Sequence, residues 1–323
     1  MCPIALMDPL VLRGFSIVLA VVFDWALGDP SNRWHPVAWL GSLIASVGSA
    51  LRSVPALSGR AGGAILALTT VAFAGASAWA LSRLAWGFGP VIGIYGDALL
   101  IYFALSASSL MQAGRRVGDA LMSGDLPAAR SAVAHLVARD TAESDDTEVA
   151  RAAVESLGEN TVDGVVAPLF WAALLGPGGV WIHKAASTLD SMVGYKTPPY
   201  TRFGTASARL DDALAWVPAR ISIPLIALAA LVTGGDAAGA WRTGLRDRLK
   251  HESPNSAHGE AAFAGALGVR LGGPVRYGER IAERPFIGTG AEPDAVVVKR
   301  ASRMVGVVAF LSGFWALTVL LTV

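Results

Sequence analysis

The sequence predicts a mainly α-helical protein that crosses a membrane several times, with residues 1–323 forming a single membrane-embedded domain. Of the 323 residues, 53% are hydrophobic and only 16% are charged, whereas soluble domains usually carry about 25% charged residues. Several stretches are long and apolar enough to cross a bilayer, which takes about 20 residues as a helix. No run of alternating β-branched residues predicts a sheet.

Several apolar segments have the length of membrane spans. The first has no Lys or Arg before it and no small-residue cleavage site after it, so we expect a retained span rather than a signal peptide. The last follows Lys299, Arg300 and Arg303, and such basic residues tend to mark the cytoplasmic side of a span. The predicted spans are 10–27, 61–86, 90–110, 213–232 and 304–323.

The segment 165–182 has two interpretations. Its sequence, VVAPLFWAALLGPGGVWI, is long enough to cross, but Pro168 and the Gly-Pro-Gly-Gly at 176–179 interrupt it. The chain either crosses here or enters the membrane and returns. Irregular backbone at membrane depth is tolerated only where protein or a water-filled cavity surrounds it.

The polar segment 112–160 is expected to be helical. Asp125 before Pro127 is a typical helix start, and the cluster Ser144-Asp145-Asp146 is expected to open a second helix over about 146–158.

Composition excludes several kinds of protein. The net charge of +1 gives no electrostatic bias toward nucleic acid. The single cysteine, Cys2, permits neither an internal disulfide nor a cysteine metal cage. The sequence contains neither a Cys/His zinc pattern nor the G-x-x-x-x-G-K-[ST] phosphate loop.

The second predicted helix carries its charges on one face. Glu148, Arg151, Glu155 and Glu159 are spaced three, four and four residues apart. The face leads into Asn160-Thr161-Val162-Asp163 and then into the apolar segment. It is either a solvated face with ion pairs along the helix or a surface of carboxylates and amides that holds Mg²⁺, because polar groups at a membrane edge tend to face a cavity.

Other polar clusters also have a structural and a functional interpretation. Turn chemistry and helix capping explain Asp29 and His35 as well as a site does. Arg139 next to Asp140 indicates a local ion pair or a fork for phosphate. The segments 181–212 and 248–273 are amphipathic connectors or parts of a site for an anion, a nucleotide or a metal. Their candidate residues are Lys184, Asp190, Tyr195, Lys196, Lys250, His251, Asn255 and Glu260.

Five blocks of the sequence resemble the adenosylcobinamide-phosphate synthase family, the CbiB/CobD type of cobalamin biosynthesis protein. They occur in the family's order between about residues 20 and 280. The blocks are DWALGDPSNRWHPVAWLGSLI, LVARDTAE with EVARAAVESLGENTVDGVVAPLFWAALLG, KAASTLDSMVGYK, FGTASARLDDALAWVPAR and KHESPNSAHGEAAFAGALGVRLGG.

Departures from the family pattern concern backbone geometry more than candidate side chains. Gly158 and Ala138 stand where Ala and Gly are expected, and Glu252 and Gly259 stand where Pro is expected. The segment TPPYTRFG after Lys196 is less charged than the family pattern.

The resemblance implies a polytopic protein of the bacterial inner membrane that joins adenosylcobyric acid to (R)-1-amino-2-propanol or its O-phosphate. The reaction would depend on ATP and Mg²⁺ and pass through an acyl phosphate. It implies corrin and amino-alcohol substrates, contact with the lipid bilayer and with other corrin-pathway enzymes, and no nucleic-acid partner. The alternatives are a non-catalytic membrane sensor or regulator on the same scaffold, and a corrinoid transporter.

Motif membership and position at the membrane edge select the candidate site residues. The catalytic candidates are Glu155, Glu159, Asn160, Asp163, His35 and His251. The candidates for substrate or nucleotide binding are Arg139, Arg151, Lys184, Tyr195, Lys196, Lys250 and Asn255. The metal-ligand candidates are Glu155, Glu159, Asp163 and Asp190.

Overall fold

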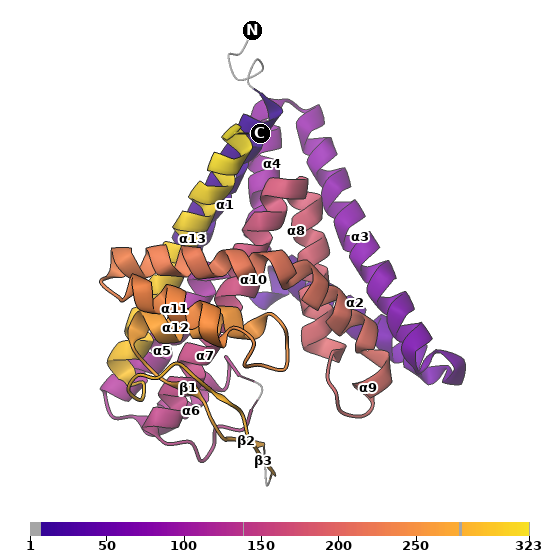
Figure 1. Cartoon of the computed structure of the whole chain (residues 1–323). Helices are drawn as coiled ribbons and strands as arrows, with labels where there is room; N and C mark the ends of the chain where they lie inside the picture. Colours follow the sequence, from indigo (N-terminus) through magenta and orange to yellow (C-terminus); the bar gives the residue numbers. More distant parts are fainter. Residues whose placement is uncertain (1–7, 138, 278–279, 323) are drawn as a thin grey trace. The chain divides into compact units, whose positions relative to one another are not determined.

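The computed structural model describes residues 8–137, 139–277 and 280–322, and most of its regular structure is helical (Figure 1). The chain divides into two compact units. The first contains Met1–Ser106, Ala167–Ala215 and Gly313–Val323, and the second contains Ala107–Val166 and Trp216–Ser312. The mainly α-helical class is confirmed, and the expectation of one membrane-embedded domain stays a prediction.

Six helices are long and apolar enough to cross a membrane, which fits the predicted polytopic architecture. They are Pro9–Leu27, Arg60–Gly87, Pro90–Met122, Asp146–Val193, Thr205–Thr233 and Ala295–Thr322. The predicted spans 10–27, 61–86 and 304–323 coincide closely with α1 (Pro9–Leu27), α3 (Arg60–Gly87) and α13 (Ala295–Thr322). The span predicted over 213–232 lies within the longer helix α10 (Thr205–Thr233).

The span predicted over 90–110 is not one unbroken helix. The helix α4 (Pro90–Tyr102) ends before the predicted boundary, and α5 (Ala107–Met122) begins after a short turn. At this turn the backbone N–H of Leu105 donates to the carbonyls of both Ile101 and Tyr102, so the α-helical ladder tightens and ends. The apolar composition continues through the turn, which is why the sequence did not reveal it.

The first unit packs around a core shared by α2 (Pro36–Ser53), α3, α8 (Ala167–Val193) and the short helix α9 (Tyr200–Phe203). Phe203 is fully buried in this core. The carbonyl oxygen of Phe203 lies only 1.7 Å from the position that a Cβ atom would take at Gly63 of α3. The backbone of α9 therefore rests directly on α3, and only a glycine permits the approach.

The helix α8 reverses direction in its middle. Gly176 has φ 64° and ψ −157°, and Pro177 follows it. A Cβ atom at Gly179 would lie 2.9 Å from the carbonyl oxygen of Trp171, whereas eight residues of continuous helix would separate them by about 12 Å. Figure 1 shows the two arms of α8 meeting at this turn.

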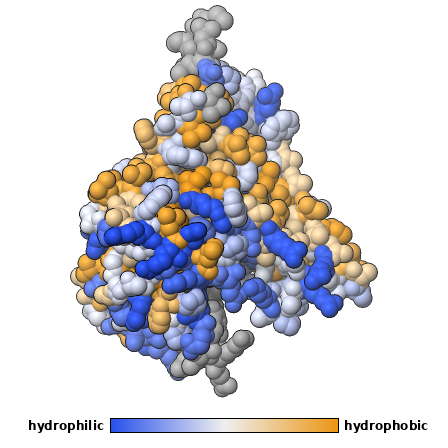
Figure 2. Space-filling view, in the orientation of Figure 1, coloured by the Kyte–Doolittle hydropathy of each residue, from blue (hydrophilic) through white to orange (hydrophobic). Residues whose placement is uncertain are grey.

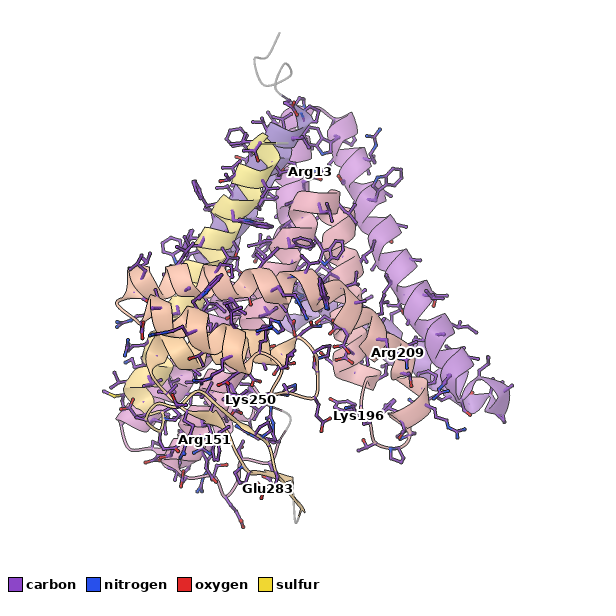
Figure 3. The ribbon with its side chains drawn as sticks, in the orientation of Figure 1. Arg13, Arg151, Lys196, Arg209, Lys250 and Glu283 are labelled. Atoms are coloured by element: carbon purple, nitrogen blue, oxygen red, sulfur yellow. The ribbon has the colours of Figure 1, made fainter. Side chains whose placement is uncertain are left out.

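The reversal at Gly176 fits the re-entrant interpretation of 165–182, whereas the length and composition of Asp146–Val193 also fit a membrane span, so the choice between the two interpretations stays a prediction. Arg13 of α1 lies near the turn (Figure 3), and its Nη1 donates to the carbonyl of Ala173 at 3.3 Å. This contact satisfies a carbonyl at the end of the first arm, where the helix itself supplies no donor.

The outer face of α3 is apolar. Its exposed side chains include Leu68, Phe73, Trp79 and Leu84. Figure 2 shows hydrophobic residues along this helix. Such a surface is suited to lipid rather than water.

The second unit combines helices with a short irregular sheet. Its helices are α5, α6 (Leu126–Val133), α7 (Asp146–Thr161), α11 (Ala237–Asp247) and α12 (Ser256–Leu267), with the first part of α13 and most of α10. A π-helical turn, Val162–Val166, follows α7. The strands are β1 (Leu271–Gly272), β2 (Val275–Tyr277), β3 (Arg280–Ala282) and β4 (Phe286–Ile287).

The strands form two antiparallel pairs that the sequence did not predict. Leu271 of β1 pairs with Ile287 of β4, and Arg276 of β2 pairs with Ile281 of β3. They are too short to show a period of two in the sequence.

The predicted helix starts in this unit are confirmed. The carboxylate of Asp125 accepts a hydrogen bond from the N–H of Ala128 and caps α6. Asp145 and Glu148 form a reciprocal capping box at the start of α7.

We predict that Gly63→Ala destabilises the protein, because the new methyl group would collide with the carbonyl of Phe203. Overpacking of this kind typically costs about 1–3 kcal/mol. The free energy of unfolding or the melting temperature of the detergent-solubilised protein measures the effect. Gly87→Ala is the matched control on the same helix, because its new methyl group would meet no described atom within 4 Å beyond the neighbouring residues and backbone of α3 itself. Equal melting temperatures for the two variants would contradict this packing.

Candidate functional site

The charged face of α7 turns its acids toward a buried cluster. Glu155 is only 5% exposed, which excludes the interpretation of a fully solvated face. Its Oε2 lies 3.0 Å from Nη2 of Arg139, and its Oε1 accepts a hydrogen bond of 2.7 Å from the N–H of Gly272. The side chain of Arg284 also approaches, with Nη1 3.9 Å from Oε2. Glu155 thus connects α7 with the loop after α6 and with β1.

A second buried acid, Glu260 of α12, lies beside the first. It is 1% exposed, and its Oε1 lies 3.9 Å from Nη2 of Arg284. Its Oε2 has no hydrogen-bond partner among the described residues. Arg284 therefore lies between the carboxylates of Glu155 and Glu260, while one oxygen of Glu260 stays free to bind something else.

Two glycines bring these acids together. A Cβ atom at Gly158 of α7 would lie 3.0 Å from Cα of Glu260, and one at Gly259 of α12 would lie 2.2 Å from the carbonyl oxygen of Gly158. The two helices therefore cross in backbone contact at this pair. A larger residue at either position would not fit this crossing without a shift of the backbone.

The electrostatics of the cluster favour a neutral Glu260. Burial is the largest cause that raises its pKa well above the usual value, and the charges of Glu159 and Glu155 raise it further. Arg284 and Arg139 oppose the shift but do not cancel it. With Glu260 neutral, the two other carboxylates balance the two guanidinium groups, and ionisation of Glu260 would add a negative charge that a bound cation would neutralise. We refer to Glu155, Glu159, Glu260, Arg139 and Arg284 as the carboxylate–arginine cluster.

His251 lies within the electrostatic range of this cluster. Burial lowers its pKa, with Glu159 opposing and Arg284 adding to the effect. The N–H of Ser253 donates to Nδ1 of His251 at 3.0 Å. A neutral imidazole that accepts at Nδ1 carries its proton on Nε2 and can donate a hydrogen bond from there.

A cavity of about 200 Å³ adjoins the carboxylate–arginine cluster. It is lined by Arg139 of the cluster and by Gly272, and both of these residues contact Glu155. The other lining residues are Asp140, Glu143, Ser144, Glu148, Arg151 and Pro274. The cavity thus places two arginines, with acids around them, at the entrance to the buried carboxylates.

Arg151 is held at this cavity by an acid from the loop before α13. Its Nη2 lies 2.5 Å from Oε2 of Glu292, and Nη2 of Arg270 lies 2.5 Å from Oε1 of the same carboxylate. These two guanidinium groups lower the pKa of Glu292, with the hydrogen bond from Arg270 as the largest cause. Arg151 and Lys250, both labelled in Figure 3, belong to the second unit.

Two other candidates of this unit make local contacts. The amide of Asn160 donates to the carbonyl and hydroxyl oxygens of Ser156, each at 2.9 Å. The ammonium of Lys250 lies 2.9 Å from Oδ1 of the fully buried Asp247. These partners give Asn160 and Lys250 a structural function, while their predicted functions in the site stay predictions.

Asn255 and Asp163 complete the candidates of the second unit. The amide oxygen of Asn255 accepts a hydrogen bond of 3.0 Å from Nη1 of Arg220. Asp163 is partly exposed on the π-helical turn after α7. A π-turn of this kind is frequent at functional sites.

The remaining candidates belong to the first unit. His35 caps α2, since its Nδ1 accepts from the N–H of Val37 at 3.2 Å. Burial lowers its pKa, Asp29 opposes this and Lys184 adds to it. Asp190 is partly buried near the end of α8. Tyr195 and Lys196 are exposed on the loop between α8 and α9, where Figure 3 labels Lys196.

One residue of the carboxylate–arginine cluster, Arg284, was not named from the sequence. Glu260 was named there with Lys250, His251 and Asn255, but no catalytic, binding or metal function was assigned to it. Arg284 lies in an unremarkable segment between β3 and β4, and only the folded chain shows its position. Ala138, which stands where the resemblance predicts glycine, lies outside the described residues.

The carboxylate–arginine cluster is suited to a cation whose coordination shell is completed by a bound ligand. Among the described residues, no group of three or more His, Cys, Asp or Glu side chains could hold a metal ion alone. Both oxygens of Glu155 are engaged by Arg139 and Gly272, whereas Oε2 of Glu260 has no partner there. Mg²⁺ usually takes one or two carboxylates and fills its shell with water and phosphate oxygens. Glu159 and Glu260 match that pattern better than a complete protein cage.

Comparison with known proteins identifies relatives along most of the chain. The model of the CobD/Cbib protein family matches residues 17–305. The chain is 45% identical to the cobalamin biosynthesis protein CobD of Pelobacter propionicus over 286 residues, which cover 87% of this chain and 85% of the relative. It is 41% identical to CobD of Klebsiella pneumoniae (91% and 93% covered) and 41% identical to CobD of Mycobacterium tuberculosis (90% of each chain covered).

No solved structure matches the chain. The resemblance seen in the five sequence blocks is confirmed by these relatives. Their names support a role in cobalamin biosynthesis and imply a biosynthetic enzyme. The six long apolar helices indicate an integral membrane protein. The chain belongs to the CobD/Cbib family.

Proposed function

We propose that this protein forms an amide bond between a propionate carboxyl group of adenosylcobyric acid and (R)-1-amino-2-propanol or its O-phosphate. The reaction consumes ATP, requires Mg²⁺ and yields adenosylcobinamide or adenosylcobinamide phosphate. The observation that carries the proposal is the buried carboxylate–arginine cluster beside a cavity with two arginines. Membership of the family supports the corrin substrate.

Amide formation from a free carboxylate requires activation, because the carboxylate oxygen is a poor leaving group. In the proposed reaction the carboxylate oxygen attacks the γ-phosphorus of ATP, ADP leaves, and an acyl phosphate results. The neutral amine then attacks the acyl carbon, inorganic phosphate leaves, and the amine nitrogen loses its proton. Catalysis of phosphoryl transfer consists mostly of positioning and charge stabilisation.

The arginines are assigned to the anionic groups of the substrates. Arg139 and Arg284 carry planar guanidinium groups that match carboxylate and phosphate oxygens. Glu155 holds Arg139 in position through their 3.0 Å contact, and the hydrogen bond from Gly272 fixes Glu155 in turn. Arg151 at the cavity is the third candidate for phosphate contact, and its ion pair with Glu292 holds its side chain in position.

Glu159 and Glu260 are the residues that would hold Mg²⁺. Glu260 offers a buried oxygen without a partner among the described residues, and Glu159 is close enough to raise the pKa of Glu260. Bound Mg²⁺ would neutralise charge on the phosphate oxygens. Asp163, Asp190 and Glu155 remain the other metal-ligand predictions.

His251 is proposed to donate a hydrogen bond from Nε2 to a substrate oxygen. This function follows from its acceptor contact at Nδ1 and its lowered pKa, both of which favour the neutral imidazole. A neutral donor avoids adding a further positive charge next to the arginines. The base that accepts the amine proton is not assigned to a residue.

We predict that the purified protein converts adenosylcobyric acid, Mg-ATP and the amino alcohol or its phosphate into a product with the mass of the amide. Mass spectrometry identifies the product and thereby the form of the amino alcohol. ATP-independent accumulation of unmodified corrinoid in proteoliposomes, without any amide, would contradict the proposal and indicate the transporter. Corrinoid binding without product or transport would indicate the sensor or regulator.

We predict that Glu260→Gln lowers kcat of this reaction by about 100-fold or more, the scale expected when one charge-stabilising group is removed. Glutamine keeps the size of the side chain but cannot become a negatively charged metal ligand. Arg242→Gln is the control, because the side chain of Arg242 is 75% exposed. Unchanged kcat in a Glu260→Gln protein with a normal melting temperature would remove Glu260 from the mechanism.

We predict that the stability of the wild-type protein falls relative to Glu260→Gln as the pH rises from about 5 to 8. The pKa of Glu260 is raised in the folded state, so its contribution is complete below the unfolded pKa and is lost as pH approaches the folded pKa. The loss amounts to at most about 1.4 kcal/mol per pH unit. Melting temperatures of both proteins across this range measure the difference.

Mg²⁺ provides a second arm of the same experiment. It should restore stability to the wild-type protein at the higher pH more than to Glu260→Gln, since it binds the ionised carboxylate. Melting curves that stay parallel for the two proteins, with and without Mg²⁺, would contradict a buried titrating Glu260.

A further inference from the structure

The helix α11 turns back along α10 within the second unit. α10 ends at Thr233, and α11 begins at Ala237. A Cβ atom at Gly244 of α11 would lie 2.9 Å from Cγ2 of Ile223, which precedes the end of α10 by about 15 Å of helix. A helix that led away from the end of α10 could not reach Ile223. Residues 216–247 therefore form a helical hairpin, the α10–α11 hairpin (Figure 1).

The end of α11 carries charge beside α10. Arg246 follows Gly244 by two residues, and its Nε and Nη2 lie 2.9 and 2.7 Å from the carboxylate oxygens of the fully buried Asp247. Nζ of Lys250 lies 2.9 Å from Oδ1 of the same carboxylate. The side chains of Arg246 and Lys250 are 51% and 42% exposed. Two partly exposed cations therefore share one buried anion.

α10 also carries a cation near its middle. Nη1 of Arg220 donates to the carbonyl of Trp216 at 2.7 Å and to Oδ1 of Asn255 at 3.0 Å. Asn255 ends the polar segment between α11 and α12. This contact brings a polar loop to the same half of α10 that contacts α11. The middle of α10 thus has polar neighbours from outside its own helix.

These neighbours conflict with a transmembrane position for this half of α10. The helix has 29 residues and is about 43 Å long, so a crossing of the hydrocarbon core of about 30 Å would place Arg220 and Ile223 inside the core. Asn255 and the cations at the end of α11 would have to enter with them. Exposed cations in hydrocarbon are costly. Length and composition permit α10 to cross, whereas its contacts favour a position outside the core.

The hairpin nevertheless exposes apolar side chains on both of its helices. On α11, Trp241 and Leu245 lie four residues apart and therefore share a face. On the second half of α10, the exposed apolar side chains include Leu228, Leu231 and Val232. Exposed apolar side chains, a tryptophan and nearby cations on one helical element are typical of the layer between water and hydrocarbon.

We propose that the α10–α11 hairpin lies in the interfacial layer of a lipid bilayer and does not cross it. Leu231, Val232, Trp241 and Leu245 contact the boundary between headgroups and acyl chains, while Arg220, Arg246 and Lys250 stay among the headgroups. The span predicted over 213–232 is then an interfacial helix in its second half. The proposal does not depend on amide formation and would stand if the proposed function failed.

Spin-label depth measurements test the proposal on the full-length protein in vesicles of phosphatidylethanolamine and phosphatidylglycerol. Leu245→Cys and Trp241→Cys are made separately in a Cys2→Ser background, because the sequence has no other cysteine. Phe73→Cys on the apolar outer face of α3 is the reference for the hydrocarbon core, and Ser123→Cys in the exposed turn before α6 is the reference for water. Collisions of each label with oxygen and with a water-soluble nickel complex report its depth.

We expect the labels on α11 to lie about 5–10 Å deep, at the boundary between headgroups and acyl chains. Their nickel collision rates should be at least about 3-fold higher than at the core reference and at least about 3-fold lower than at the water reference. If one of the two cysteine variants fails to fold, the other gives the same measurement, because both positions share one face of α11.

Three results would overturn the proposal. Labels on α11 as deep as the label at Phe73 would show that the hairpin enters the hydrocarbon core. Collision rates equal to those at Ser123 would show that it faces water. Spin–spin broadening between labels of two molecules, lost on dilution with unlabelled protein, would show that a second copy of the chain covers this face.

Discussion

The second unit depends on the burial of Glu155 and Glu260 within one cluster. An ionised carboxylate removed from water loses several kcal/mol of solvation unless charges and hydrogen bonds replace it. Arg139, the N–H of Gly272 and Arg284 supply this replacement from three different segments. Because these donors come from the loop after α6, from β1 and from the segment after β3, the short strands are held against α7 and α12 by the acids beneath them.

Glycine makes the cluster geometrically feasible. The backbone contact between Gly158 and Gly259 lets α7 and α12 approach until their acids share Arg284. The same principle operates in the first unit, where Gly63 admits the carbonyl of Phe203 and Gly176 permits the reversal of α8. In both units a helix comes into backbone contact with a neighbouring segment at a glycine, where a side chain would prevent the contact. The positions of these glycines therefore influence which polar groups come together.

Local features of the fold could be predicted from the sequence, because they depend on neighbouring residues. The capping residues Asp125 and Asp145, the apolar length of α1 and α3, and the acidic face of α7 all follow from short-range patterns. The break after Tyr102 and the short strands could not be predicted, since composition is continuous at the first and periodicity is absent in the second. The reversal at Gly176 was foreseen only as one of two alternatives.

The candidate site could be predicted only in part, because the sequence shows which residues share a helix face but not which residues of other segments lie opposite them. Acids at helical spacing indicated Glu155 and Glu159, but no sequence pattern shows which buried acid on another helix lies opposite them. Asn160 and Lys250 make local contacts with Ser156 and Asp247 that the sequence did not predict, and their functions in the site stay predictions. Arg284 shows the opposite case, in which an inconspicuous residue bridges two buried carboxylates.

In the proposed reaction, the carboxylate–arginine cluster activates a carboxylate by phosphoryl transfer. Adenosylcobyric acid labelled with ¹⁸O in the reacting carboxyl group tests this most directly. If an acyl phosphate forms, one ¹⁸O atom passes from the carboxylate into the inorganic phosphate released by the wild type, and Glu155→Gln transfers it far more slowly per folded molecule. Label recovered in AMP, or equal transfer rates for the two proteins, would contradict the claim.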